Sequence, residues 1–163
     1  MEKHITVIKG DGIGPEIVNE AIKVLERIAE KHHHTFHYQE VLAGGCAIDA
    51  YGTSLTDEVL QACIDSDSVL LGAVGGPKWD QVDPSIRPEK ALLGIRKGMG
   101  LYANLRPASI LKQLAHTSPL RKDIVDQGID FMVVRELISG VYFGDKKTYE
   151  ENNELVACDQ MIY

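Results

Sequence analysis

Short apolar segments alternate with helix-forming segments along the first hundred residues, and this alternation restricts the chain to a small set of folds. Residues 5–8 and 68–74 are rich in β-branched and other apolar side chains, as in strands buried on both faces, and residues 35–41 indicate a further strand. Apolar residues at helical spacing over 15–29, and a threonine cap at the start of 56–64, indicate helices between them. This order predicts an α/β protein with an open, mainly parallel sheet flanked by helices. Ligands of such sheets bind beyond the carboxyl ends of the strands.

The pattern changes near residues 98–100, where we place a domain boundary. A further helix is expected over 88–99, followed by strands over 101–107 and 130–137. Ser139-Gly140 resembles a turn that would pair the second strand with Val141-Tyr142-Phe143 in an antiparallel hairpin. The sequence therefore predicts a first domain segment over residues 1–99 and the start of a second, incomplete α/β domain over residues 100–163.

Composition argues against several classes of function. The formal net charge is −7 and the Lys and Arg residues are scattered, so no basic face is offered to nucleic acid or to an anionic membrane. The 3 cysteines show no Cys-x-x-Cys spacing, which argues against a disulfide framework or a zinc knuckle and favours the cytoplasm. We expect neither a signal peptide nor an apolar run of the roughly 20 residues that span a bilayer.

A glycine-rich turn, Gly10-Asp11-Gly12-Ile13-Gly14-Pro15, separates the first strand from the first helix. Glycines at such a place let backbone N–H groups approach a phosphate, as in the dinucleotide fingerprint. The third glycine comes one position early, however, and Glu40 lies further along the chain than a ribose-binding carboxylate would. Tight strand-to-helix geometry that needs glycine explains the turn better than a Rossmann phosphate site does.

Five strings in a fixed order make the chain distinctive. GDGIGPEI is followed by LLGAVGGPKWD, RPEKALLGIRK, NLRPA and VRELISGVYFG. In this order they resemble the β-decarboxylating dehydrogenases, the family of isopropylmalate, isocitrate and tartrate dehydrogenases. The resemblance runs from Ile5 to about Gly144. It implies the isocitrate/isopropylmalate dehydrogenase-like α/β fold, which is not the Rossmann fold, with residues 1–99 in the NAD-binding domain and residues 100–163 in the substrate and dimerisation domain.

The resemblance implies roles for four residues that handle the substrate. Arg96, Arg106 and Arg135 match the positions where the family holds the carboxylates of a malate, and a guanidinium suits this task because its fork donates two parallel hydrogen bonds. Tyr142 matches the tyrosine that is thought to deliver a proton to the enol left by decarboxylation. A phenol has an ordinary pKa of about 10, so it needs a neighbouring cation for easy proton exchange. Outside these motifs, the arginines would be ordinary surface residues and the tyrosine an ordinary strand aromatic.

The helix over 88–99 indicates which malate is held. Isocitrate dehydrogenases resemble one another in placing a serine and an asparagine on this helix, whereas this chain has Glu89, Leu92 and Leu93. An apolar pair suits a branched alkyl group, since each buried methylene contributes about 0.8 kcal/mol, and it would desolvate a carboxylate without pairing it. The alternative is that both leucines are only core residues.

The loop after the third strand is where the resemblance places the nicotinamide end of NAD. The residues expected to border it come from the glycine-rich turn, this loop and the next helix: Ile13, Gly76, Pro77, Lys78, Trp79 and Glu89. A plain surface loop shaped by glycine and proline is the alternative, because binding loops are commonly built in the same way.

No metal ligands are expected within these residues. His32, His33 and His34 are consecutive, so on a helix they point in different directions and cannot converge on one ion; they favour the helix C-terminus instead. The resemblance implies Mg²⁺ or Mn²⁺ held by aspartates beyond the equivalent of Tyr163. The catalytic lysine and the residues that bind the adenosine half of NAD are expected there too.

The resemblance thus predicts NAD-dependent oxidative decarboxylation of (2R,3S)-3-isopropylmalate in leucine biosynthesis, by a cytoplasmic homodimer of which this chain forms the N-terminal portion. The 163 residues alone are expected to be inactive. Two alternatives stay open: a non-catalytic fragment or a subunit completed by a partner chain, and a relative that acts on tartrate or homoisocitrate. The choice between NAD and NADP also stays open.

Overall fold

The computed structural model describes residues 1–163, and their contacts divide the chain into two compact units, Met1–Gly100 and Leu101–Tyr163. The boundary lies beside the change of pattern expected near residues 98–100. No helix in the structure combines the length and the apolar character needed to cross a membrane. The functional assignment of the two segments stays a prediction.

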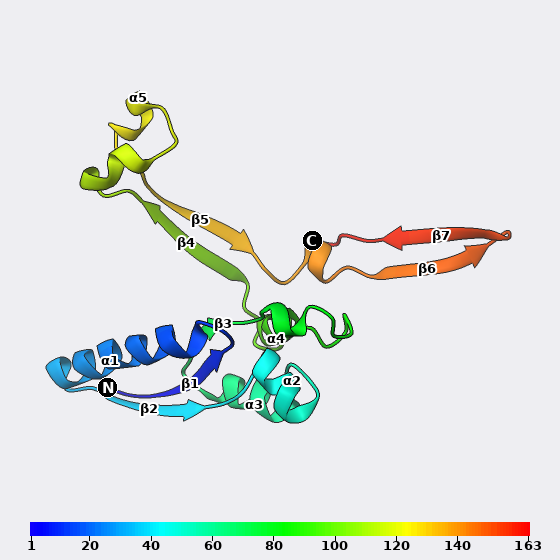
Figure 1. Cartoon of the computed structure of the whole chain (residues 1–163), viewed down its shortest axis with the longest axis horizontal. Coiled ribbons are helices and arrows are strands. Elements are labelled where there is room, and N and C mark those ends of the chain that lie inside the picture. Colours follow the sequence, from blue (N-terminus) through cyan, green and yellow to red (C-terminus); the bar gives the residue numbers. More distant parts are fainter. The chain divides into compact units, whose positions relative to one another are not determined.

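The first unit alternates strands and helices, as Figure 1 shows in blue to green. Its elements are β1 (Glu2–Gly10), α1 (Gly14–His32), β2 (Thr35–Glu40), α2 (Gly45–Tyr51), α3 (Asp57–Asp65), β3 (Ser68–Ala73), the 3₁₀ helix η1 (Pro77–Trp79) and α4 (Pro88–Gly98). The strand order is β2-β1-β3, and both pairings are parallel. The predicted parallel sheet with flanking helices is therefore confirmed.

The core of the first unit lies where β1 meets α3 and α4. Ile8 of β1, Cys63 of α3 and Ile95 of α4 belong to one buried cluster, together with Ala43, Val59 and Ala91. Ile8 is fully buried, and burying such a side chain contributes about 1.5–3 kcal/mol. This packing holds in place the carboxyl end of the parallel sheet, where the chain leaves β1 and β3.

The apolar stripe of α1 was expected to be core throughout, and this is wrong in part. Val18 is 2% exposed, whereas Ile17 and Ile28 are 47% and 42% exposed. The reason is that α1 packs mainly along β3 and β1, and the three-stranded sheet covers only part of the helix's apolar face. Thr56 caps α3 as predicted, because its hydroxyl accepts a hydrogen bond from the N–H of Val59.

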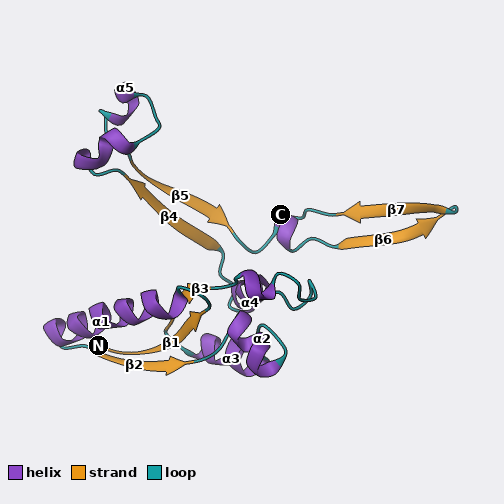
Figure 2. Ribbon diagram, in the orientation of Figure 1, coloured by secondary structure: helices purple, strands orange, loops and turns teal.

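The second unit consists of two hairpins and short helical turns, drawn in Figure 2 as separate pairs of strands. Its elements are β4 (Ala103–Ser109), η2 (Lys112–Thr117), α5 (Lys122–Val125), β5 (Asp130–Glu136), η3 (Gly140–Tyr142), β6 (Lys146–Glu151) and β7 (Glu154–Asp159). β4 pairs with β5 and β6 pairs with β7, both antiparallel. Every side chain of β6 is exposed.

The hairpin expected between β5 and Val141-Tyr142-Phe143 is not formed. Val141 and Tyr142 lie in the 3₁₀ helix η3, and β5 pairs with β4 instead. Gly140 has a φ of +72°, and its N–H donates to the carbonyl of Ile162 at 2.8 Å. The local β propensity of these residues is overridden because the chain turns here to run beside residues 160–163.

Candidate functional site

Asp11 lies at the centre of the loops that follow the three parallel strands. Its side chain is buried, with the residue 3% exposed, and its two oxygens accept three backbone hydrogen bonds. Oδ2 accepts from the N–H groups of Gly45 and Gly75 at 2.7 and 2.8 Å, and Oδ1 accepts from Cys46 at 2.7 Å. The backbone N–H of Asp11 also donates to the carbonyl of Ala73 at 2.7 Å. One carboxylate therefore joins the loops after β1, β2 and β3.

The glycines around Asp11 are required by close packing. Gly44 has a φ of +96°, and a Cβ at this position would stand 2.7 Å from Oδ2 of Asp11. A Cβ at Gly10 would collide with the carbonyl of Ala73, and a Cβ at Gly14 would collide with the carbonyl of Lys9, where β1 and β3 leave the sheet together. The glycine-rich turn thus serves close approach of backbone segments. The N–H groups at the start of α2 bind the protein's own carboxylate.

The loop predicted to border NAD is attached to α2 through two side chains. Lys78 Nζ lies 2.5 Å from Oδ2 of Asp49, and Trp79 Nε1 donates to Oδ1 of the same carboxylate at 3.2 Å. These contacts hold the pKa of Asp49 below its ordinary value, the hydrogen bond from Lys78 having the largest effect. The Trp79 ring lies against Gly45, where a Cβ would overlap it. Lys78 and Trp79 therefore anchor the loop with their side chains.

A pocket of about 320 Å³ lies beside this loop, within the first unit. Three residues expected to border the cofactor line it, namely Gly76, Trp79 and Glu89, together with Asp80, Arg87 and Pro88. Glu89 lies against the loop backbone, since a Cβ on Gly75 would stand 2.8 Å from its Oε1. The other predicted residues do not line this pocket. Pro77 and Lys78 are exposed, and Ile13 is 55% exposed at the N-cap of α1. A role in cofactor binding stays a prediction for all six.

Helix α4 brings the predicted substrate residues of the first unit onto one stripe. Glu89, Leu92, Leu93 and Arg96 are spaced at three, four and seven residues, which places them on the same side of a helix. The neighbouring side carries Ala91 and Ile95, which are 1% and 3% exposed in the core. Leu92 and Leu93 are half-buried. The core residues of α4 and its predicted substrate residues therefore lie on different sides of the helix, and the last of the substrate residues is Arg96.

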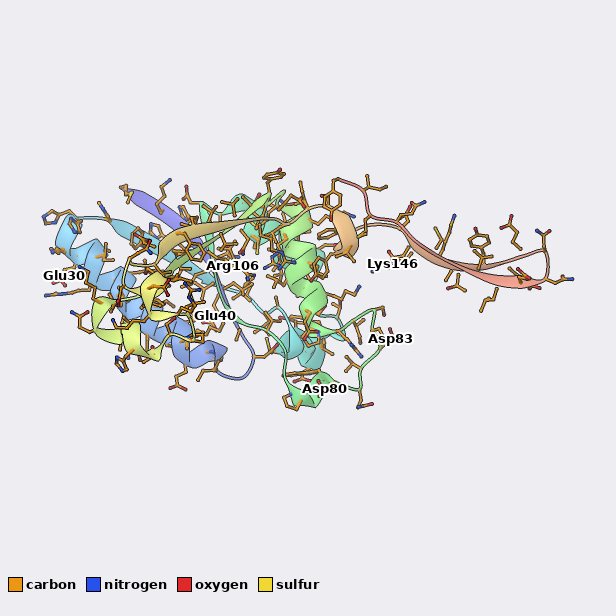
Figure 3. All side chains as sticks on the ribbon, turned by 90° about the horizontal axis from the view of Figure 1, so that it is seen from above. Glu30, Glu40, Asp80, Asp83, Arg106 and Lys146 are labelled. Atoms are coloured by element: carbon orange, nitrogen blue, oxygen red, sulfur yellow. The ribbon has the colours of Figure 1, made fainter.

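Two predicted arginines share one face of the β4–β5 hairpin. Arg135 is the register partner of Asn104, and Arg106 lies two residues beyond Asn104 on the same face. The Arg106 Nε donates to the Asn104 Oδ1 at 2.6 Å. Figure 3 labels Arg106 on this hairpin, where its side chain is exposed. The opposite face carries Leu105, Met132 and Val134, which are 61%, 51% and 65% exposed.

Tyr142 is presented beside Arg135 by a turn held at both ends. The Arg135 guanidinium carbon lies 5.4 Å from the centroid of the Tyr142 ring. Glu136 fixes the start of the turn, since its carboxylate accepts from the N–H of Ile138 at 2.7 Å and from the Ser139 hydroxyl at 2.9 Å. Tyr142 remains 58% exposed. The second unit therefore places the tyrosine next to the cation that its predicted chemistry needs.

One cluster of possible metal ligands lies away from these loops. Glu2, His4 and His37 have ligand atoms within 4.8 Å of one another, and all three are exposed. They occupy the opposite end of β1 from Asp11, where His4 is the register partner of His37. A hydrogen-bond distance of 2.7 Å between His37 Nε2 and Glu2 Oε1 accounts for their approach. The binding of Mg²⁺ or Mn²⁺ by aspartates beyond the equivalent of Tyr163 stays a prediction.

Three residues of this site were missed from the sequence. Asp11 was treated only as part of a glycine-rich turn, Asp49 lies on the unpredicted helix α2, and Glu136 stands in a matched motif without an assigned role. The local signals are weak, because the partners of Asp11 lie 34, 35 and 64 residues further along the chain. A single acidic residue inside a run of glycines after a buried strand is the signal that was available.

Comparison with known proteins agrees with these motifs. The profile of the isocitrate/isopropylmalate dehydrogenase family matches residues 4–163. A 3-isopropylmalate dehydrogenase of Helicobacter hepaticus is 58% identical over 163 residues, which is 100% of this chain and 46% of that protein. One from Clostridium pasteurianum is 54% identical over 162 residues, 99% of this chain and 45% of that protein. The chain thus spans less than half the length of these relatives.

Solved structures agree with the fold. A β-decarboxylating dehydrogenase from Thermococcus kodakarensis superposes with a TM-score of 0.64 at 29% identity, covering 98% of this chain and 41% of that chain. An isocitrate dehydrogenase from Methylococcus capsulatus gives a TM-score of 0.70 at 25% identity, covering 97% of this chain and 42% of that chain. The family profile accounts for nearly every residue from the first strand onward. The chain belongs to the isocitrate/isopropylmalate dehydrogenase family.

Proposed function

We propose that this chain is the N-terminal portion of an enzyme that oxidises and decarboxylates (2R,3S)-3-isopropylmalate with NAD in leucine biosynthesis. The observation that carries the proposal is identity of 50–58%, across the whole chain, to proteins named 3-isopropylmalate dehydrogenase. The stripe on α4 supports the same substrate. Leu92 and Leu93 suit an alkyl group, and Arg96 lies one turn further on the same side.

In this proposal the arginines hold the two malate carboxylates. Arg106 and Arg135 lie on one face of β4–β5, so their guanidinium groups can engage a substrate from the same direction. Each planar fork offers two parallel hydrogen bonds to a carboxylate, which fixes orientation as well as position. Arg96 contributes from α4 beside the leucines. The alkyl group then lies against Leu92 and Leu93.

Tyr142 acts as the proton donor in the second half of the reaction. Loss of carbon dioxide from the β-keto acid leaves an enol, and the enol carbon must then take up a proton. The guanidinium carbon of Arg135, which holds a carboxylate in this proposal, lies 5.4 Å from the Tyr142 ring centroid, so the phenol is presented beside the bound substrate as a general acid. The exposed position of Tyr142 lets bulk water return the proton.

The cofactor and the metal complete the proposed chemistry. When bound, NAD accepts the hydride, and Mg²⁺ or Mn²⁺ stabilises negative charge that develops on the substrate oxygens. Gly76, Trp79 and Glu89 border the nicotinamide end of NAD in this proposal, supported by the pocket that they line.

Three free cysteines support a cytoplasmic location. The exposed hairpins of the second unit are consistent with a homodimer.

The test is a spectrophotometric assay of NADH formation. Residues 1–163 are joined, at Tyr163, to the remaining C-terminal part of the Helicobacter hepaticus relative, because the chain matches 46% of that protein. We expect activity on 3-isopropylmalate with Mg²⁺ or Mn²⁺. Activity on malate, tartrate, isocitrate and homoisocitrate should be much lower, and the unfused chain should be inactive.

Two results would contradict the proposal. Preference for tartrate or homoisocitrate over 3-isopropylmalate would assign another substrate to the α4 stripe. A folded fusion with no dehydrogenase activity would support a non-catalytic chain, provided that the intact relative, assayed in parallel, is active.

A further inference from the structure

We infer that Asp11 is a positioning residue: its buried carboxylate holds the Gly75–Trp79 loop in place by binding the loop and α2 together. The positioning itself rests on the contacts within the first unit. Its consequence for the nicotinamide end of NAD rests on the proposed function. Asp11 is assigned no contact with substrate or cofactor.

The first step is the direct hold on the loop. Oδ2 of Asp11 accepts from the N–H of Gly75 at 2.8 Å, where the chain leaves β3 with a φ of +97°. Only glycine adopts this conformation without strain, so the carboxylate fixes a residue whose backbone is otherwise free to rotate. Hydrogen bonds to an ionised carboxylate are about twice as strong as those between neutral groups.

The second step is an indirect hold through α2. Asp11 accepts from the N–H groups of Gly45 and Cys46, which begin that helix. Asp49, one turn further along α2, binds Lys78 and Trp79, and the Trp79 ring lies on Gly45. The loop is thus held at Gly75 by Asp11 directly and at Lys78 and Trp79 by a helix whose N-terminus Asp11 fixes.

An aspartate is the side chain that meets these demands. Three N–H groups converge on it, and a carboxylate can accept all three because both of its oxygens are acceptors. An asparagine of the same shape keeps one acceptor oxygen and replaces the other with an NH₂ group. That group would face one or two N–H donors and leave them unpaired in a buried site.

Trp79 makes the inference measurable, because it is the only tryptophan in the sequence. In Asp11→Asn, the loop should loosen and the half-buried Trp79 ring should move into water. We expect red-shifted emission and an acrylamide quenching constant that rises roughly twofold, as for local opening of a packed side chain. The far-ultraviolet circular dichroism should change little, since the longer helices α1 and α4 do not depend on the Asp11 side chain for their hydrogen bonds.

Asp67→Asn is the matched control. Asp67 also accepts a backbone hydrogen bond, from the N–H of His4 at 2.8 Å, and binds Lys3 Nζ at 2.7 Å at the other end of β1. This variant should lower the melting temperature without changing Trp79 emission or quenching. A general loss of stability would move both variants alike, whereas loss of loop positioning affects Asp11→Asn alone.

Exchange of the wild-type amides tests the inference even if Asp11→Asn does not fold. The N–H groups of Gly45, Cys46 and Gly75 should exchange more than about 100-fold slower than free amides, because each is bound to a buried carboxylate. Exchange of Gly75 at the free-amide rate would overturn the inference. Unchanged Trp79 quenching in a folded Asp11→Asn variant would do the same.

The proposed function fails by a different measurement. If the fused enzyme does not reduce NAD while Asp11→Asn loosens Trp79 as expected, the positioning stands and the cofactor assignment is wrong. If the fused enzyme is active and Asp11→Asn leaves Trp79 unchanged, the dehydrogenase stands and the positioning role is wrong.

Discussion

Arg135 places its guanidinium carbon 5.4 Å from the centroid of the Tyr142 ring, so the turn after β5 joins the cation proposed to bind a carboxylate to the phenol proposed to donate a proton. The two residues are separated by the turn that Glu136 holds closed. Binding and chemistry should therefore be separable by substitution.

Tyr142→Phe in the fused enzyme should lower kcat by roughly 10²- to 10⁴-fold, the usual effect of losing one positioned proton donor. KM for 3-isopropylmalate should change little, because the ring and its contact with Arg135 remain. Steady-state kinetics measures both constants. A normal kcat for the complete reaction would make Tyr142 a structural residue of the turn.

Arg106→Lys should instead mainly raise KM for 3-isopropylmalate. Lysine keeps the positive charge but loses the planar fork, and in the proposed function the carboxylate is held in both the ground state and the transition state. The exposed position of Arg106 makes a folding defect unexpected. Arg121→Lys is the control, since Arg121 pairs with Asp123 outside the predicted site. A fall in kcat with unchanged KM would contradict this assignment.

Replacing Leu92 and Leu93 with polar residues should lower kcat/KM for 3-isopropylmalate far more than for malate, because an apolar pocket discriminates by about 1–3 kcal/mol per alkyl group. Both leucines are half-buried, so some loss of stability is also expected. The ratio of the two kcat/KM values isolates the effect on specificity. Equal losses on both substrates would show that the leucines only pack.

The Asp49 contacts should give Trp79 fluorescence a pH dependence. The Lys78 contact and the Trp79 hydrogen bond lower the pKa of Asp49 in the folded protein. The stabilisation is therefore present above the ordinary aspartate pKa of about 3.9 and is lost as pH falls through the lower folded value. A titration of Trp79 emission should show a midpoint below that ordinary value. Asp49→Asn should abolish this step, and its persistence in the variant would assign it to another group.

Thiol reactivity gives an independent test of the electrostatic effect of Asp11 on the neighbouring Cys46. Burial, followed by the charge and hydrogen bond of Asp11, raises the pKa of Cys46, and burial alone raises that of Cys63. Iodoacetamide at pH 8 should therefore modify Cys46 slowly, since the thiolate is the reactive form, and Cys63 last, since its side chain is also fully buried. Asp11→Asn should speed modification of Cys46 relative to Cys158. Peptide mass spectrometry measures the order, and an unchanged Cys46 rate would contradict the electrostatic contribution of Asp11.

The parallel sheet of the first unit could be predicted because its signals are local. β1 and β3 contain short apolar runs, β2 follows the first helical segment as a further short strand, and Thr56 is a conventional cap. Helix α2 has seven residues and begins at two glycines, so it lacks both a clear stripe and a capping side chain. Helix propensity therefore could not predict α2.

The candidate site residues also differ in whether a local sequence signal was available for them. Glu89 and Arg96 were singled out by the resemblance of their motif, and their helical spacing accounts for their place on one side of α4. The turn at Tyr142 was predicted wrongly because three residues with high strand propensity are bent by Gly140 and by the return of the chain at Ile162. Asp11 could not be recognised because its hydrogen-bond partners are brought to it by the parallel sheet.

The exposed β6–β7 hairpin has a consequence for the order in which the chain becomes rigid. A two-stranded ribbon buries little apolar surface and is marginally stable in water by itself. Residues 146–159 should therefore acquire lasting structure after the first unit has folded, and their amides should be among the first to exchange with solvent. The amides of β1 and β3, which pair in the parallel sheet next to Asp11, should exchange later than those of this hairpin.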